Sequence, residues 1–391
     1  MKKLLIVLLL SIFVIPSAFA LEIKSNNAVL YNLNDNKILI DKNKNEQASI
    51  ASLTKLMTAL VAIEKIEDLD NKVSFVKSDY ENLKKLDASE SSMDKNKQYS
   101  YKDLLYGLIM ESGADCANAL ARLTYENDYN FVKAMNEKAK QLGLKNTHFA
   151  NPIGLDDKDN YSTVDEVATI LKKCLEHKDL KTIILSKSYT LSDGTEIKHT
   201  IDWYAKEMKI DLSYIKGGKT GFETDSGYAL ASIAEKDDVT LLLVTTNGKN
   251  KFNHIEDAKN IYSYYFDNYS YQTILHSGET VTTINGKYLS KDKINIYQKE
   301  DIKAYVENNY KEEDVKILYK GLDTLTIKNK KDEKIGTIEV YYKNELIKTE
   351  DAILNQKLHP DFRLIAAATL SYILMGTFTA TVIKRKKAYL N

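Results

Sequence analysis

The stretch Ala48-Ser49-Ile50-Ala51-Ser52-Leu53-Thr54-Lys55 carries a serine and a lysine three residues apart, where an apolar helical pattern begins. Residues at this spacing share one face of a helix, so the lysine amine can reach the serine hydroxyl. Serine is a poor nucleophile unless a base takes its proton, and lysine is such a base only when burial or a nearby cation lowers its pKa. The stretch therefore predicts a nucleophile, Ser52, activated by Lys55.

Spacing alone does not distinguish this pair, because the same pattern recurs four times in a lysine-rich chain. What sets Ser52 apart is its place after small residues and at the start of an apolar helix that we expect to run to about Ile66. We expect the other pairs on the surface: Ser74/Lys77, Ser92/Lys95, Ser213/Lys216 and Ser290/Lys293.

Two further motifs lie downstream. Lys219-Thr220-Gly221 follows two glycines and precedes β-rich runs, which predicts a strand edge where an extended peptide could add. Its lysine and threonine would bind a terminal carboxylate, and its glycine would allow close approach. Ser112-Gly113-Ala114 breaks a helical stretch, and its hydroxyl could relay a proton to a leaving amine. Taken singly, Lys219-Thr220-Gly221 also fits a solvated lysine before a turn. Ser112-Gly113-Ala114 by itself also fits a helix-breaking loop.

The wider pattern predicts how the chain is organised. A hairpin at 28–40 and helices at 52–66, 101–123, 131–142 and 163–176 precede β-rich runs at 228–234 and 239–246 and a helix to about Tyr265. Thr163 and Glu166 have the spacing of a capping box. This arrangement predicts one α/β domain over 21–270, with helices ahead of an antiparallel sheet. Short alternating runs at 280–284, 314–318, 325–328 and 337–342 predict a small all-β domain over 271–350, followed by a linker over 351–363.

The two ends of the chain predict export and membrane attachment. Residues 1–20 have the basic start, the apolar run and the small-x-small ending of a signal peptide. Residues 364–383 contain no charge and are long enough to cross a bilayer, which predicts a transmembrane helix. The alternative is a buried core helix or a helix that lies in the membrane interface. The basic tail 384–391 should stay cytoplasmic, which places residues 21 to about 360 on the extracytoplasmic face of the membrane.

Composition excludes some partners and chemistries. Lys+Arg and Asp+Glu both number 55, so no net basic field predicts a nucleic-acid partner. The six histidines show no zinc-ligand spacing and no phosphate-binding glycine loop is present, so we expect no metal and no cofactor. Cys116 and Cys174 could pair in an exported protein, or could be two buried free thiols.

Together and in this order, the three motifs resemble the signature of penicillin-binding proteins and class A β-lactamases. The surrounding residues are similar to the low-molecular-weight D-alanyl-D-alanine carboxypeptidases, which are serine peptidases of the penicillin-binding type. The resemblance covers essentially all of 21–270, and residues 271–350 look like that family's second domain, notably at 334–340. The segments that carry it in the first domain are 48–55, 108–121, 146–156, 160–163 and 218–227.

The resemblance implies a fold and an activity. The fold would be an α/β (α+β) β-lactamase-like catalytic domain with an antiparallel sheet and a helical subdomain, then a small all-β domain and a transmembrane helix. The enzyme would remove the terminal D-alanine from peptidoglycan pentapeptide stems through a Ser52 acyl-enzyme, and so limit cross-linking. β-Lactam antibiotics would be covalent inhibitors.

The resemblance also implies residue roles. Lys55 would accept the Ser52 proton, and Ser112 would assist proton transfer. Lys219 and Thr220 would hold the substrate carboxylate beside Gly221. The backbone N–H groups of Ser52 and Phe222 would form the oxyanion hole.

The chain departs from the family at Ala114, where an asparagine is usual. Asn118 lies one helical turn later, and the hypothesis is that its amide substitutes at the substrate. The other departure is the spanning helix, since many relatives end in an amphipathic helix that lies on the membrane.

Two rival functions remain open from the sequence. A β-lactamase on the same fold would need a carboxylate that activates water, and Asp156, Asp157, Asp165 and Glu166 are candidates. A catalytically silent wall-binding protein would keep the fold without the chemistry, and Ala114 is the one feature that favours it. Steady penicillin hydrolysis would identify the first, and absence of covalent penicillin labelling would identify the second.

Overall fold

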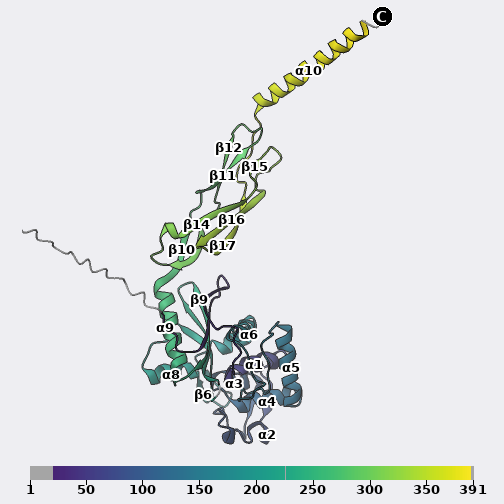
Figure 1. The fold of residues 1–391 in the computed structure, drawn as a ribbon. Helices are drawn as coiled ribbons and strands as arrows, with labels where there is room; N and C mark the ends of the chain where they lie inside the picture. The colour runs from purple at the N-terminus through teal and green to yellow at the C-terminus, as the bar shows by residue number, and fades with distance from the viewer. Residues whose placement is uncertain (1–20, 225, 389–391) are drawn as a thin grey trace, which may run out of the picture. The chain divides into compact units, whose positions relative to one another are not determined.

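A computed structural model describes residues 21–224 and 226–388 of the chain (Figure 1). The chain divides into two compact units between Phe266 and Asp267. The predicted signal peptide, residues 1–20, lies outside the described residues.

The first unit contains a five-stranded sheet whose neighbouring strands are all antiparallel, in the order β2-β1-β9-β8-β7. The chain's first strand pairs with the last of these strands, so the two ends of the unit meet in the middle of the sheet. β7 forms one edge, which leaves one side of it open to another extended chain. The strands are β1 (Asn27–Asn32), β2 (Lys37–Lys42), β7 (Ile215–Glu223), β8 (Gly227–Lys236) and β9 (Val239–Gly248).

Helices cover both faces of this sheet (Figure 1). Successive side chains of a strand point to opposite faces, and Ala229, Ala231 and Ile233 of β8 face the helical core. On the other face, α9 (Asn253–Asn268) packs through Tyr262, whose hydroxyl donates to the Ser232 carbonyl oxygen at 2.9 Å. Burial on both faces explains why β8 and β9 are almost continuously apolar.

The helical core surrounds α1 (Thr54–Ile63), whose ten residues are all buried. It follows a short 3-10 turn, η1 (Ala51–Leu53), so the predicted helix start is confirmed within one turn. The helix predicted over 101–123 is broken where expected, between α3 and α4. The other helices here are α2 (Lys77–Tyr80), α3 (Tyr101–Met110), α4 (Ala114–Tyr125), α5 (Asp128–Gln141) and α6 (Val164–Glu176), with a short turn η2 (Lys84–Leu86).

The capping box predicted at the start of α6 is only half formed. The Thr163 side chain accepts from the backbone N–H of Glu166 at 3.1 Å. The Glu166 carboxylate turns away and accepts from the backbone N–H groups of Lys145 and Asn146 at 2.9 and 3.0 Å. Glu166 thus fixes the start of the 146–156 segment onto α6 instead of closing the box.

Several short elements were not predicted. Residues 67–100, between two of the predicted helices, contain β3 (Lys72–Ser74) and β4 (Gln98–Ser100), which pair with each other. Between α6 and β7 the chain forms α7 (Lys178–Ile184), α8 (Thr200–Met208) and a two-stranded ribbon of β5 (Ser188–Thr190) and β6 (Glu196–Lys198). Cys116 and Cys174 are both buried and free.

The second unit is built from short ladders around an apolar core, antiparallel except for the parallel pair of β11 and β15. Its strands extend beyond 271–350 at both ends, because β10 begins at Tyr269 and β17 ends at Ile353. The predicted strand at 325–328 is wrong, since β15 ends at Leu325 and a turn follows. The strands are β10 (Tyr269–Leu275), β11 (Thr280–Gly286), β12 (Lys293–Tyr297), β13 (Ile302–Glu307), β14 (Val315–Gly321), β15 (Thr324–Leu325), β16 (Lys334–Tyr342) and β17 (Glu345–Ile353), with a turn η3 (Glu312–Asp314).

The segment predicted as a linker, residues 351–363, packs on this unit. The backbone N–H of Leu354 donates to the carbonyl of Glu333 at 2.9 Å, and that of Ser290 donates to the carbonyl of His359 at 2.8 Å. These bonds hold the segment against the β-rich core almost to the start of the last helix.

The last helix, α10, runs from Phe362 to Ala388. Its window Ala366–Ile383 has a mean hydropathy of 1.5 and none of it is buried against the rest of the chain. Within the described residues, α10 is the one helix long and apolar enough to cross a membrane. The side chains of the basic tail, 384–391, lie outside the described residues.

Candidate active site

Ser52 lies in η1, directly before the buried helix α1, and Lys55 points back to it. The Lys55 amine lies 2.9 Å from the Ser52 hydroxyl oxygen. Ala51 takes a positive φ of 47°, which an L-residue rarely adopts and which turns the chain sharply before the serine. The structure therefore places the two residues in direct hydrogen-bond contact.

The backbone of the 151–155 turn holds the Lys55 amine from the other side. Its second partner is the carbonyl oxygen of Ile153, at 2.5 Å. The Asn151 side chain shapes this turn, because its amide oxygen accepts from the backbone N–H groups of Gly154 and Leu155 at 2.7 and 3.1 Å. The sequence did not predict that a carbonyl from this segment would position the lysine.

Close packing locks the same turn against η1. Gly154 has a φ of 85°, and a Cβ there would lie 2.2 Å from the carbonyl oxygen of Ala51. Glycine is therefore required twice, by conformation and by space. The turn and the nucleophile are thus positioned together.

Burial alters the protonation of Lys55. The side chain is only 2% exposed, and burial lowers its pKa to about 8, although the charge of Glu223 acts in the opposite direction. A larger fraction of the amine is then neutral near pH 8 than in an ordinary lysine. A neutral amine 2.9 Å from a hydroxyl can take its proton.

Ser112 and Lys219 form a second hydroxyl–amine pair. The Lys219 amine lies 2.9 Å from the Ser112 hydroxyl and 2.6 Å from the carbonyl oxygen of Thr220. Lys219 is fully buried, and burial together with the charge of Lys55 lowers its pKa well below the usual value. The side chain of Lys219 is thus held by Ser112, and Lys219 is not among the residues that line the cavity described below.

β7 brings Thr220, Gly221 and Phe222 against the nucleophile. A Cβ on Gly221 would lie 3.1 Å from the backbone nitrogen of Ser52 and 3.2 Å from the Cβ of Ala51. This closeness places the backbone that follows Gly221 beside the Ser52 N–H. Both backbone positions predicted for the oxyanion hole therefore lie at the contact between η1 and β7.

The start of α8 adds residues that the sequence did not single out. The hydroxyls of Thr200 and Thr220 are 2.8 Å apart. His199 accepts from the backbone N–H of Ile201 through Nδ1 at 3.1 Å, so its Nε2 carries the proton that it donates to Gly218 at 2.8 Å. Burial lowers the His199 pKa to about 4, so the ring is neutral at physiological pH. The sequence signal that could have indicated these residues is the polar pair His199-Thr200 at the start of a helix, ahead of Gly217 and Gly218.

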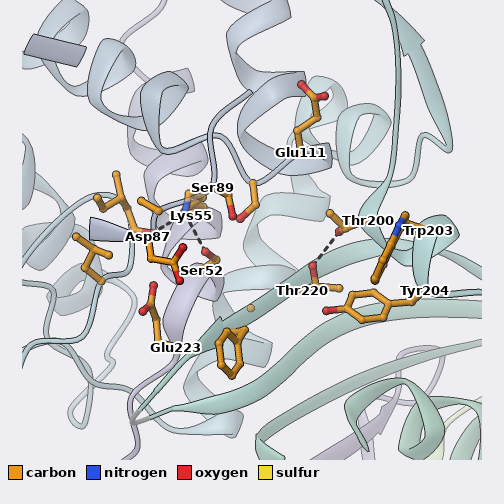
Figure 2. A pocket seen from close by; sticks show the side chains of 16 residues that line it. Ser52, Lys55, Asp87, Ser89, Glu111, Thr200, Trp203, Tyr204, Thr220 and Glu223 are labelled. Atoms are coloured by element: carbon orange, nitrogen blue, oxygen red, sulfur yellow. Dashed lines mark hydrogen bonds between the residues drawn. The ribbon is translucent and has the colours of Figure 1, made fainter. Parts of the chain in front are cut away.

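These groups line one cavity of about 220 Å³, drawn in Figure 2. Thr200, Trp203 and Tyr204 of α8 lie on one side of Ser52, and Asp87 and Glu223 lie on the other. The lining residues are Ser52, Lys55, Asp87, Ala88, Ser89, Glu111, Ser112, Ile153, Leu155, Thr200, Trp203, Tyr204, Thr220, Gly221, Phe222 and Glu223.

The structure does not bring Asn118 to this cavity. Its amide nitrogen donates to the backbone carbonyl of Asp79 at 3.0 Å, and the residue is absent from the lining. Ala114 begins α4, is completely buried, and donates its N–H to the Ser89 carbonyl at 2.8 Å. Four residues along α4 advance the helix by about 6 Å along its axis. This advance carries the Asn118 side chain to Asp79 of α2 and away from the cavity, so this geometry gives no support to the substitution hypothesis.

The four carboxylates that were candidates to activate water in a β-lactamase form hydrogen bonds outside the cavity. Asp156 accepts from the Ser49 hydroxyl at 3.0 Å, and Asp165 accepts from the Tyr31 hydroxyl at 2.5 Å. Asp157 accepts from the backbone N–H of Asp159 at 2.8 Å, and Glu166 caps the 146–156 segment as described above. None of the four is among the residues that line the cavity.

Comparison with known proteins fits this geometry. Residues 15–250 match the family described as D-alanyl-D-alanine carboxypeptidase. The chain belongs to that family. Residues 269–360 match the C-terminal domain of penicillin-binding protein 5, which accords with the β-rich second unit.

Individual relatives of this D-alanyl-D-alanine carboxypeptidase span most of its length. D-alanyl-D-alanine carboxypeptidase DacF of Bacillus subtilis is 27% identical over 89% of the chain and 92% of the relative. The D-alanyl-D-alanine endopeptidase of Escherichia coli is 30% identical over 61% of the chain and 76% of the relative. Penicillin-binding protein 5 of Haemophilus influenzae superposes with a TM-score of 0.64 at 26% identity, over 86% of the chain and 98% of that structure.

This chain is therefore a serine peptidase that acts on peptidoglycan. Its predicted fold is confirmed, with a mixed helix-and-sheet catalytic part and a β-rich C-terminal domain. No finding favours the β-lactamase or the silent wall-binding alternative.

Proposed function

We propose that Ser52 carries the acyl-enzyme through which this carboxypeptidase removes D-alanine from pentapeptide stems. The Ser52 oxygen attacks the carbonyl carbon between the two D-alanines, and its proton passes to the neutral amine of Lys55. The oxyanion that forms accepts from the backbone N–H groups of Ser52 and Phe222. Preorganised donors of this kind typically contribute about 3 kcal/mol to lowering the barrier.

The collapse of this intermediate needs a proton on the leaving amine. Ser112 supplies it from its hydroxyl, and Lys219, held 2.9 Å away, returns a proton to Ser112. The low pKa of Lys219 makes it a ready proton donor in its charged form. Lys55 then passes on the proton that it took from Ser52, which restores Lys219, so that both lysines return to their starting states. Water attacks the ester carbonyl, and Lys55 accepts a proton from that water. As the ester bond breaks, Lys55 gives this proton to the Ser52 oxygen, and the shortened stem leaves.

The leaving D-alanine would be held by its carboxylate. The paired hydroxyls of Thr220 and Thr200 lie on the cavity wall beside the nucleophile. Lys219 lies behind this wall, and its amine contacts the Ser112 hydroxyl. In this proposal the two threonine hydroxyls contact the carboxylate, whereas the sequence predicted a direct contact with Lys219.

One observation carries the proposal: the buried Lys55 amine touches Ser52 inside a cavity that also contains Ser112 and Thr220. Release of D-alanine from a pentapeptide by wild type and by Ser52→Ala tests it. Wild type is expected to release D-alanine, and Ser52→Ala is expected to lose at least a thousandfold in rate. Ser213→Ala is the matched control, because Ser213 has the same spacing to Lys216 but bonds Asp211 on the surface.

The same serine would react with β-lactams and form a long-lived acyl-enzyme. We also place the enzyme at the membrane, with α10 as a single anchor and both units on the extracytoplasmic face. The supports are the exposed apolar helix α10 and the predicted signal peptide and basic tail. Trimming pentapeptides there would remove donors for cross-linking.

A further inference from the structure

Glu223 is a cavity residue for which the acyl-transfer steps provide no role. It is the last residue of β7 and lines the cavity together with Ser52. Side chains at alternate positions of a strand share a face, so Glu223 points to the same side as Lys219, which reaches Ser112. Within the described part of the chain, its half-buried carboxylate makes no hydrogen bond and no ion pair.

The order of the residues along β7 indicates whether Glu223 faces the part of the substrate before or after the scissile bond. Thr220 lies at the carboxylate end, and Phe222 provides the backbone N–H at the scissile carbonyl. An extended peptide lying antiparallel to β7 advances about 3.3 Å per residue. Its residues before the scissile bond therefore run past Glu223, on the side of Ser52 away from Thr220 (Figure 2).

We propose that Glu223 determines specificity by binding an ammonium group on the side chain that precedes D-alanyl-D-alanine in the stem. This inference rests on the proposed orientation of the substrate along β7. A single carboxylate in a partly dry site gains more from a cation than from water, because the cation offsets its desolvation.

The surroundings of Glu223 make the carboxylate receptive to a cation. Burial raises its pKa to about 7, and the nearby carboxylates Asp156 and Asp87 act in the same direction, against the charge of Lys55. An arriving ammonium would relieve this cost and favour the ionised form. Asp87 is exposed at the end of the η2 turn, whereas Glu223 is fixed by β7, so Glu223 is the residue placed to discriminate.

Two substrates that differ in one charge test the proposal. They are Nα-acetyl-L-Lys-D-Ala-D-Ala, with a free ε-amine, and its Nε-acetylated form, and the readout is the ratio of their kcat/KM values. Wild type is expected to favour the free amine by about threefold to tenfold. Glu223→Gln is expected to bring the ratio close to one, and Glu223→Asp to restore part of it.

A matched control removes the same charge nearby. Glu90 is exposed beside Ser89 and does not line the cavity, so Glu90→Gln should keep the wild-type ratio. A wild-type ratio of one, or a preference that survives in Glu223→Gln, would overturn the proposal. So would an acyl-enzyme that persists in Glu223→Gln with both substrates, because Glu223 would then act in hydrolysis.

Fluorescent penicillin separates this proposal from the proposed function. Labelled wild type and labelled Glu223→Gln with equal ratios would contradict the role of Glu223 alone. An unlabelled wild type would contradict the proposed acylation of Ser52 itself.

Discussion

Lys55 has two partners that make opposite demands on its amine. The Ile153 carbonyl, at 2.5 Å, only accepts hydrogen bonds, so it needs an N–H. The Ser52 hydroxyl must give up a proton to the same nitrogen. A neutral amine satisfies both, because it keeps two N–H groups and one lone pair. Burial, which lowers the pKa to about 8, makes that form accessible.

The pH dependence of acylation follows from this pKa. Below pH 8 the folded enzyme holds Lys55 mostly protonated, and the base is blocked. The second-order rate of acylation by a β-lactam is therefore expected to rise about tenfold per pH unit below pH 8 and to level off above it. A stopped-flow or quench series from pH 6 to pH 9 measures this. A flat profile across that range would contradict the role of Lys55.

A second prediction concerns the Asn151 side chain, which shapes the turn that presents the Ile153 carbonyl. Asn151→Ala removes the acceptor for three backbone N–H groups, so Lys55 should lose its fixed position. Acylation is expected to fall by about ten- to a hundredfold. Asn146→Ala is the control in the same segment, because among the described residues the Asn146 side chain accepts one hydrogen bond, from the exposed Gln47. Equal rates for the two variants would contradict this role for Asn151.

At the scale of single residues, a sequence pattern predicts only contacts between residues that are close in the chain. A spacing of three on a helix predicts that Lys55 reaches Ser52, and the two atoms lie 2.9 Å apart. The contacts of the Ile153 carbonyl with Lys55 and of Thr200 with Thr220 could not be predicted, because they depend on a turn and a helix that fold back from distant parts of the chain. Asn118 shows the opposite limit, since one helical turn carried its amide along α4 to Asp79 and away from the cavity.

At the element scale, the contact between β7 and η1 aligns the oxyanion donors. Gly221 lies where a methyl group would press on the Ser52 nitrogen at 3.1 Å. Gly221→Ala is expected to push β7 away and to lower acylation by penicillin about tenfold. Gly143→Ala is the comparison, because Gly143 has a φ of 75° with nothing within 4 Å of its Cβ. It should lower the melting temperature through backbone strain and leave acylation intact. A Gly221→Ala variant that acylates like wild type would contradict the alignment.

The elements that sequence predicted are those with a clear apolar period. The hairpin near the N-terminus, α5, α6, β8 and β9 lie where expected. β7 was harder to delimit, because Gly217 and Gly218 suggest a turn but are strand residues. At Gly217 a Cβ would meet the Ile184 carbonyl oxygen at 1.9 Å, so close packing explains the glycine and not a bend.

At the scale of the whole molecule, pairing between distant segments limits prediction. A catalytic part with helices ahead of an antiparallel sheet was predicted and is confirmed. That β1 inserts beside β9 was not predictable, because any edge-compatible strand could pair there. The end of the β-rich unit was also placed too early, since Ala352 and Leu354 lie in its core and residues 351–360 bond to it through their backbone.

The anchor gives a prediction for the intact protein. Removal of residues 362–391 deletes α10 and leaves the backbone bonds of the preceding segment in place. Penicillin-labelled protein is expected to move from the membrane fraction to the soluble fraction, with its acylation rate within about twofold of wild type. Labelled protein that stays in the membrane after truncation would contradict the anchor.

The proposed mechanism requires that Ser52 is the acylated residue. The most direct measurement is mass spectrometry of peptides from enzyme quenched after reaction with penicillin. One penicilloyl group is expected on the peptide that contains Ser52, and none in Ser52→Ala. A penicilloyl group on Ser112 or on any other residue, or no covalent adduct at all, would contradict it.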